Sequence, residues 1–269
     1  MPATQSQIAL LRWYVEMGAD ESTGWEPQDR LAPKPAAARP VSTAAPVPAT
    51  PAPEPVPASA RAATPDAVVS LTGHPAEAAT TLDELAAAVA AFDGCALKRT
   101  ATNTVFADGV RGAPLMIVGE APGADEDRIG KPFVGRSGQL LDRMLAAIGF
   151  SRQTNTYITN IVFWRPPGNR KPTGDEIAAC LPFVWRHIAL ARPRVVLLSG
   201  GTATSAILDR GEGITRLRGR WFDLAVPGLD QSVPAIASYH PSFLLRTPAR
   251  KSEAWRDLLA IQAKFGESG

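Results

Sequence analysis

The stretch LMIVGEAPGADED, residues 115–127, decides the fold of this chain. Its first four residues form a short apolar run that is typical of a buried parallel strand. The run breaks at Gly119 into a turn that holds Glu120, and the acidic residues that follow can open a helix. Ligands of open α/β sheets bind where strands end in this way. A carboxylate at such a position therefore indicates a functional site.

Composition predicts a packed core without a membrane segment. Of the 269 residues, 45% are hydrophobic and 20% charged. No apolar run approaches the roughly 20 residues of a membrane helix, and no secretory signal pattern opens the chain. We therefore expect a cytoplasmic protein with no membrane partner, and two cysteines agree with a reducing compartment. The net charge of +2 permits a nucleic-acid partner without requiring one.

Changes in composition divide the chain into three parts. Residues 1–31 form an N-terminal helical segment, in which 5–17 have an amphipathic pattern. Residues 32–79 are rich in Pro and Ala and are predicted to be a flexible linker. Residues 80–269 form the main domain. The N-terminal helix either recruits a protein partner or packs on the domain, and the sequence favours neither.

Strand and helix patterns alternate within the main domain. Thr81 and Glu84 form a capping box for a helix that follows. The apolar runs typical of strands are 115–118, 157–163, 195–199 and 233–237. The helical patterns between them are 137–148, 174–190 and 202–208. This alternation predicts an α/β domain with a parallel sheet covered on both faces.

Two further polar residues follow predicted strands. Asn160 interrupts an apolar run, and His240 follows the last strand. Each has a structural interpretation, since buried amides and imidazoles often only satisfy local hydrogen bonds. Their shared position at strand ends favours a functional one, and an amide suits the edge of a pyrimidine. The GEAPG turn lacks the spacing of a dinucleotide-binding loop, and its proline removes an N–H donor.

Several loops carry residues that suit a nucleic acid. Phe133 lies in a glycine-rich loop and could stack on a flat ring, although such an aromatic often only fills the core. The loop 165–172 combines prolines with three cations, and 214–221 places arginines on one side if it is extended. Leu244 and Leu245, flanked by cations, are expected to be exposed and to serve as a wedge between stacked bases.

Five motifs taken together resemble the family-4 branch of the uracil-DNA glycosylase superfamily. They are GEAPGADED, KPFVGRSGQLL, YITNIVFWRPPGNR, ACLPF and YHPSFLLR, in that order. The resemblance covers about residues 92–262. It implies a three-layer α/β/α sandwich with a central, mainly parallel four-stranded sheet. It also implies a monofunctional DNA repair enzyme that flips uracil out of DNA and hydrolyses its N-glycosidic bond, leaving an abasic site.

The resemblance also implies roles for individual residues. Glu120 matches the residue that activates water and offsets positive charge on the sugar, and His240 the donor to the departing base. The residues that match the uracil pocket are Ala121, Gly123, Phe133 and Asn160. Those that match DNA contacts are Pro166, Ser242, Leu244 and Arg246. Gly123 replaces the tyrosine with which another branch excludes thymine, so an open side and a broadened base range are expected.

The chain departs from the family pattern at the iron–sulfur cluster. Family-4 enzymes hold a four-iron cluster with four cysteines, of which Cys95 and Cys180 remain here. Phe92 and Trp164 occupy the other two positions. Two thiolates cannot supply the usual four ligands. We therefore expect no cluster and no other metal or cofactor, with the two aromatic side chains filling the space.

Three hypotheses stay open on the sequence. The first is an active, monomeric uracil-DNA glycosylase of the bacterial cytosol and nucleoid that acts on single- or double-stranded DNA. The second is a non-catalytic module of the same fold that binds uracil-containing or abasic DNA. The third is a glycosylase for another deaminated base, such as hypoxanthine or xanthine.

Overall fold

A computed structural model of the chain describes residues 73–266. The expected N-terminal helical segment and nearly all of the expected linker lie outside the described residues. The end of that linker, however, is packed on the domain. Ala76 and Ala79 are buried, and Arg186 donates a hydrogen bond to the Ala79 carbonyl at 2.7 Å. The packed domain therefore includes residues before 80, where the Pro/Ala composition alone had suggested linker.

One six-stranded sheet forms the centre of the domain, in the order β1-β3-β2-β4-β6-β5. The strands are β1 (Asp108–Gly109), β2 (Leu115–Gly119), β3 (Thr156–Asn160), β4 (Val195–Ser199), β5 (Trp221–Leu224) and β6 (Val233–Ser238). The four central strands are parallel and correspond to the four predicted apolar runs. Short antiparallel strands extend both edges, β1 beside β3 and β5 beside β6. These two additions lack a continuous apolar run, so the sequence did not indicate them.

Helices and 3₁₀ turns connect the strands. The longer helices are α2 (Leu82–Ala91), α4 (Arg136–Ala146), α5 (Gly174–Ala191), α6 (Gly201–Leu208) and α9 (Lys251–Gly266). The shorter ones are α3 (Ala124–Ile129), α7 (Ile214–Leu217) and α8 (Pro241–Arg246). The 3₁₀ turns are η1 (Ala96–Arg99), η2 (Pro167–Asn169) and η3 (Pro248–Arg250). The predicted helices 137–148, 174–190 and 202–208 correspond to α4, α5 and α6.

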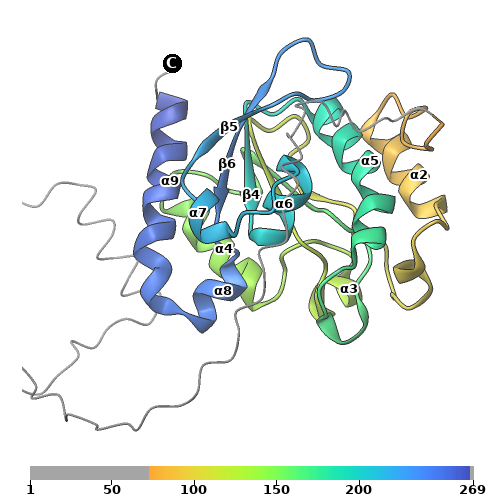
Figure 1. Ribbon diagram of the computed structural model, residues 1–269, viewed down its shortest axis with the longest axis horizontal. Helices are drawn as coiled ribbons and strands as arrows, with labels where there is room; N and C mark the ends of the chain where they lie inside the picture. The colour runs from red at the N-terminus through yellow and green to blue at the C-terminus, as the bar shows by residue number, and fades with distance from the viewer. Residues whose placement is uncertain (1–72, 267–269) are drawn as a thin grey trace, which may run out of the picture. The chain divides into compact units, whose positions relative to one another are not determined.

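Helices cover both faces of the sheet, which gives the expected three layers (Figure 1). Alternate residues of each central strand point to opposite faces. Met116 and Val118 of β2 join a core with α2 and α5, whereas Leu115 and Ile117 join another with α4 and α9. All five residues of β2, β3 and β4 are buried. This explains why these strands read as continuous apolar runs.

The capping box predicted at Thr81 and Glu84 is confirmed in part. The Thr81 hydroxyl accepts the Glu84 N–H at 3.1 Å and begins α2, but the Glu84 carboxylate returns to Thr80 rather than to Thr81. Thr173 and Glu176 form a complete capping box at the start of α5. The described residues contain no helix long and apolar enough to cross a membrane.

Three local expectations are wrong. The strand expected over 157–163 ends at Asn160, and the backbone N–H groups of Ile161 and Val162 turn to the carbonyls of Gly119 and Glu120. Residues 214–217 form α7, so the segment 214–221 is not extended, which the expected placement of its arginines on one side required. Leu244, expected to be exposed, is fully buried in the core beneath α8.

Candidate active site at the ends of the parallel strands

Polar residues at the carboxyl ends of β2, β3 and β6 lie at one end of the sheet. Gly119 is paired with Asn160 in the register of β2 and β3, which places Glu120 next to Asn160 along the sheet edge. Glu120, Phe133 and His240 line a pocket of about 1200 Å³. Parallel strands direct their carboxyl ends to one edge, and for this reason residues 120 positions apart share a pocket.

Glu120 is held by a residue that the sequence did not single out. The Thr202 hydroxyl, at the start of α6, donates a short hydrogen bond to Glu120 Oε2. Glu120 remains partly exposed in the pocket, so the carboxylate is oriented without being sealed from solvent. The available signal was the Gly200–Gly201 pair directly after β4, a strand end of the same kind as that before Glu120.

His240 has a defined tautomer. Its Nδ1 accepts the backbone N–H of Ser242 at 3.1 Å and lies 2.8 Å from the Ser242 hydroxyl. Since a backbone N–H only donates, Nδ1 carries no proton, and the proton of the neutral ring lies on Nε2. Burial, together with the nearby positive charge of Arg246, lowers the pKa of His240 to about 4. At neutral pH the ring therefore offers one N–H donor, on Nε2.

Asn160 is almost fully buried, with 1% of its surface exposed. Its Oδ1 has no hydrogen-bond partner among the described residues. A buried acceptor left unsatisfied costs about 1–3 kcal/mol, so a ligand with a matching N–H donor would remove that cost. Gly119 keeps this space free, because a Cβ there would lie 2.4 Å from Asn160 Oδ1 and 2.6 Å from the Phe133 ring.

Phe133 forms an apolar side of the same pocket. Its ring centroid lies 5.3 Å from that of His240 at an interplanar angle of 30°. The backbone of Phe133 has a φ of 53°, a left-handed conformation that residues other than glycine seldom adopt. The ring is therefore held beside His240 and Asn160 at a conformational cost.

Glu126 ties the two loops of the pocket together. Its carboxylate accepts the N–H of Gly123 at 3.1 Å and those of Val134 and Gly135 at 3.0 and 2.9 Å. A Cβ on Gly123 would lie 2.7 Å from Glu126 Oε2. The side of Gly123, expected to be open, is thus partly occupied by this carboxylate. Sequence reasoning did not consider Glu126, although a Glu three residues after an N-cap can accept the backbone N–H of the N-cap residue, as it does here from Gly123.

The other expected site residues separate into two groups. Ala121, Pro166, Ser242 and Arg246 line the pocket. Leu244 does not, because α8 directs it into the core, and the half-buried Phe243 lines the pocket instead.

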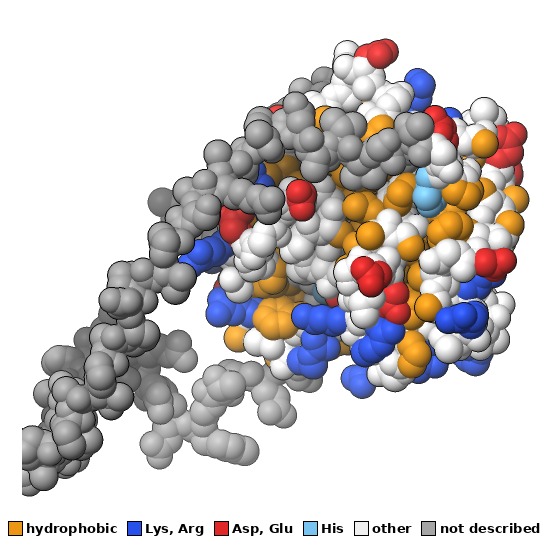
Figure 2. Space-filling model, turned by 45° about the vertical axis from the view of Figure 1, so that its right-hand side comes forward, with side chains coloured by type: hydrophobic (Ala, Val, Ile, Leu, Met, Phe, Trp, Pro, Cys, Tyr) orange, Lys and Arg blue, Asp and Glu red, His pale blue; other side chains and the backbone are white. Residues whose placement is uncertain are grey.

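Figure 2 shows Lys and Arg side chains gathered along the lower edge of the molecule, the end at which α3 and α8 lie in Figure 1. Arg136, Arg170 and Lys171 add positive charge to the pocket lining.

The two cysteines do not fit a cluster with four thiolate ligands. Cys95 and Cys180 are both buried, and a hydrogen bond with Cys95, together with burial, raises the pKa of Cys180. Trp164 is 1% exposed and donates its indole N–H to Thr104 Oγ1 at 3.0 Å. Phe92 packs edge-on against Phe183. In the described part of the chain, no group of three or more potential metal-ligating side chains is found.

Sequence comparison identifies the class of protein that combines this sandwich with this site. A model of the uracil DNA glycosylase superfamily matches residues 106–259. The chain belongs to this superfamily. A type-4 uracil-DNA glycosylase of Archaeoglobus fulgidus is 37% identical over 190 residues, which cover 69% of this chain and 94% of that protein. Those of Pyrobaculum aerophilum and Thermotoga maritima are 38% and 40% identical, over 62% and 61% of this chain and 85% and 82% of theirs. The resemblance noted from the five motifs is thereby confirmed.

Proposed function

We propose that this protein is a monofunctional uracil-DNA glycosylase, which hydrolyses the N-glycosidic bond of uracil in DNA and leaves an abasic site. The observation that carries the proposal is that Glu120, Phe133 and His240 line one pocket at the strand ends, where the buried Asn160 lies beside the Phe133 ring. The relatives named type-4 uracil-DNA glycosylases support it at 37–40% identity. Water is the only co-substrate of this reaction, and the products are free uracil and the abasic site.

Glu120 and His240 match the two charges that the reaction develops. As the bond to the base breaks, the sugar gains positive charge and the pyrimidine gains negative charge. The Glu120 carboxylate, oriented by Thr202, offsets the first and positions the attacking water. The Nε2–H of His240 donates to the O2 of the departing base. One preorganised donor of this kind contributes about 3–4 kcal/mol to transition-state stabilisation.

Asn160 and Phe133 recognise the base in this proposal. The unsatisfied Oδ1 of Asn160 accepts from the N3–H of uracil, and its amide N–H₂ donates to O4. Cytosine presents the opposite pattern at these two positions and would leave both groups unpaired. The Phe133 ring stacks on the flat face of the base. Stacking of a base on an aromatic ring contributes about 1–3 kcal/mol, which helps to offset the cost of flipping.

The rim of the pocket suits the DNA backbone. Pro166, Ser242 and Arg246 line it, and we propose that they contact phosphates on either side of the flipped nucleotide. The buried Leu244 supports no wedge in this conformation. Phe243 directly precedes Leu244 in α8 and is half-buried at the pocket, and we propose that this apolar side chain fills the gap in the base stack.

We propose that the enzyme works without an iron–sulfur cluster. Support comes from the two aromatic side chains at the positions of the missing cysteines and from the indole hydrogen bond that holds one of them. Protein purified without metal and treated with chelator should then retain its activity. A measured iron content near four atoms per chain, or loss of activity on chelation, would contradict the absence of a cluster.

We further propose that the protein acts as a monomer on DNA in the cytosol. The residues of the proposed mechanism all come from one chain, so a second copy is not needed to complete the pocket. Light scattering during gel filtration should give the mass of a single 28.5 kDa chain.

The proposed activity is tested with the Glu120→Gln variant. Wild-type protein should release uracil from labelled single- and double-stranded DNA, detected as strand scission after alkali, and Glu120→Gln should be about 100- to 1000-fold slower. Glu77→Gln, an exposed carboxylate outside the pocket, is the matched control and should keep full activity. Cleavage at hypoxanthine or xanthine but not at uracil would reassign the substrate. Binding without cleavage of any of the three would favour the non-catalytic module.

A further inference from the structure

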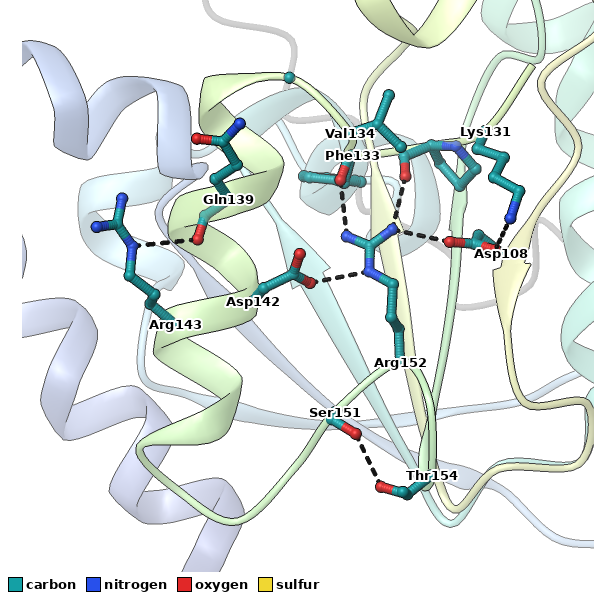
Figure 3. Close-up of polar contacts among 12 residues, drawn as sticks. Asp108, Lys131, Phe133, Val134, Gln139, Asp142, Arg143, Ser151, Arg152 and Thr154 are labelled. Atoms are coloured by element: carbon teal, nitrogen blue, oxygen red, sulfur yellow. Dashed lines mark hydrogen bonds and ion pairs between the residues drawn. The ribbon is translucent and has the colours of Figure 1, made fainter. Parts of the chain in front are cut away.

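A buried arginine outside the pocket holds the loop that carries Phe133. Arg152 lies in the turn before β3, and its side chain is 9% exposed. Its Nη1 donates to the carbonyl oxygen of Pro132 at 3.1 Å, and its Nη2 to that of Phe133 at 2.7 Å (Figure 3). The same guanidinium pairs with Asp108 of β1 through Nη1 and with Asp142 of α4 through Nε, both at 2.9 Å.

These contacts coincide with the strained conformation of Phe133. In extended backbone, successive carbonyls point to opposite sides of the chain. Here the carbonyls of residues 132 and 133 reach one guanidinium, and Phe133 has a φ of 53°. Such a conformation persists only where the surroundings supply compensating interactions. Two charge-assisted hydrogen bonds to a buried guanidinium are interactions of this kind.

The carboxylates beside Arg152 make it a rigid anchor. Asp108 is 18% exposed and also pairs with Lys131 at 3.3 Å. Asp142 is 45% exposed and contacts only the Nε edge of the guanidinium, which faces away from the loop carbonyls (Figure 3). The two ion pairs fix the plane of the guanidinium, so that the remaining N–H groups point to the carbonyls of residues 132 and 133.

We propose that Arg152 is a positioning residue for base recognition, which acts through Phe133. By holding the left-handed backbone of Phe133, it sets the ring against His240, where the flipped base stacks. This inference rests on the proposed function, because it assigns the ring to a base. Arg152 itself does not line the pocket and is not a catalytic residue.

Kinetics distinguish positioning from a contribution to folding alone. Stacking acts on the bound base before and during bond breakage, so its loss raises KM more than it lowers kcat. Arg152→Met should lower kcat/KM by about 10- to 100-fold, mainly through KM. Arg152→Lys keeps the charge and one or two donors, so its kcat/KM should lie between those of Arg152→Met and wild type. Arg111→Met, which removes an exposed arginine that pairs with Asp83 and does not line the pocket, is the matched control and should match wild type. A fall in kcat at unchanged KM, as expected from a smaller folded fraction, would overturn the proposal.

A double-mutant comparison tests whether Arg152 acts through the ring. Phe133→Ala removes the ring, so Arg152→Met added to it should change kcat/KM less than twofold further. If Arg152→Met lowers kcat/KM by the same factor in both backgrounds, the guanidinium acts on something other than Phe133, and the proposal is wrong.

NMR spectroscopy gives a readout that does not depend on activity. The chain has three histidines, so the ring C–H signals of His240 are readily assigned with a His240→Gln variant. The Phe133 ring lies close enough to shift them by its ring current. Arg152→Met should move these signals toward their Phe133→Ala positions, and Arg111→Met should leave them in place. Unmoved signals in folded Arg152→Met protein would overturn the inference. Wild-type protein that releases no uracil would overturn only the proposed function.

Discussion

Single hydrogen bonds set the protonation and orientation of the groups proposed for catalysis. The Ser242 N–H fixes His240 as the Nε2–H tautomer, and the Thr202 hydroxyl fixes one oxygen of Glu120. Neither bond changes the identity of a reacting group. Both decide which atom faces the pocket, which is the property that preorganised electrostatic catalysis requires.

The lowered pKa of His240 predicts the pH dependence. Its value of about 4, caused by burial and then by Arg246, lies below the 6.5 of an unfolded chain. Between pH 6.5 and 4 the unfolded state therefore gains a proton first, and the free energy of unfolding falls as the pH is lowered through this window. The neutral donor is present at pH 6–8, so the titration of His240 should leave kcat/KM unchanged there. An NMR titration of His240 checks the pKa, and a loss of activity with a midpoint near pH 6.5 would contradict a neutral donor.

Thr202 should matter for the rate rather than for binding. Thr202→Val removes the hydroxyl that orients Glu120, and we expect kcat to fall by about 10- to 100-fold, because a hydrogen bond to a charged group contributes about 1.5–3 kcal/mol. KM for uracil-containing DNA should stay unchanged. Thr202→Ser keeps the hydroxyl and serves as the control. A loss of kcat in Thr202→Ser with full activity in Thr202→Val would show that the methyl group, not the hydroxyl, is what matters.

At the scale of elements, the start of α4 must approach the Phe133 loop closely. Gly138, the third residue of the helix, leaves room for the Phe133 carbonyl, which would lie 1.8 Å from a Cβ at that position. Glycine has a low intrinsic helix propensity, so it is not favoured here for the sake of the helix itself. It is present because the helix and the strained loop touch there.

Gly138→Ala should therefore destabilise the protein, although the same substitution in a helix usually stabilises. Alanine in place of a helical glycine normally stabilises by about 0.5–1 kcal/mol. Here the added methyl displaces the Phe133 carbonyl from Arg152, so we expect a lower free energy of unfolding and a higher KM. Gly174→Ala, at the first residue of α5 with open space around it, is the matched control and should be neutral or stabilising. Urea denaturation and steady-state kinetics measure both effects, and a stabilised Gly138→Ala protein would contradict this account.

Across the whole molecule, two hydrophobic cores hold the sheet between its helical layers. The core beneath α2 and α5 contains Cys95, Trp164 and Cys180, together with the Phe163 side chain. Aromatic packing thus stabilises the region in which the family-4 pattern places thiolate ligands. If the enzyme works without a cluster, as proposed, stability in this region depends on filled volume.

Loss of the Trp164 side chain should therefore be costly. Trp164→Ala leaves a large cavity at a site that is 1% exposed, and we expect the free energy of unfolding to fall by about 3–5 kcal/mol. Trp164→Phe keeps much of the volume and loses the hydrogen bond to Thr104, so its loss should be smaller. Urea denaturation with and without chelator measures both variants. A change below about 1 kcal/mol for Trp164→Ala would show that this region is not tightly packed.

Much of the fold was predictable because its central strands are buried on both faces. The runs at 115–118 and 195–199 read as strands without any tertiary information, and the cap at Thr81 marked a helix start. The edge strand β5 was not predictable, since half of its residues are exposed and its pairing with β6 supplies its hydrogen bonds.

The site was predictable where function required a particular chemical group next to a strand end. Glu120, Asn160 and His240 stood out because polar side chains follow apolar runs. Leu244 was misplaced, because a leucine flanked by cations reads the same whether α8 turns it outward or inward. Arg152 and Thr202 were missed, since their importance lies in the atoms that they contact across 19 and 82 positions of sequence.

The sequence by itself determined the alternation of strands and helices, the family, and the chemical groups at the strand ends, because these depend on local periodicity and on residue type. Only the tertiary structure decided the tautomer of His240, the left-handed backbone of Phe133, and the burial of Leu244. Each of these depends on contacts between segments far apart in the chain. Such contacts form only when both faces of the sheet are covered and buried polar groups must find partners.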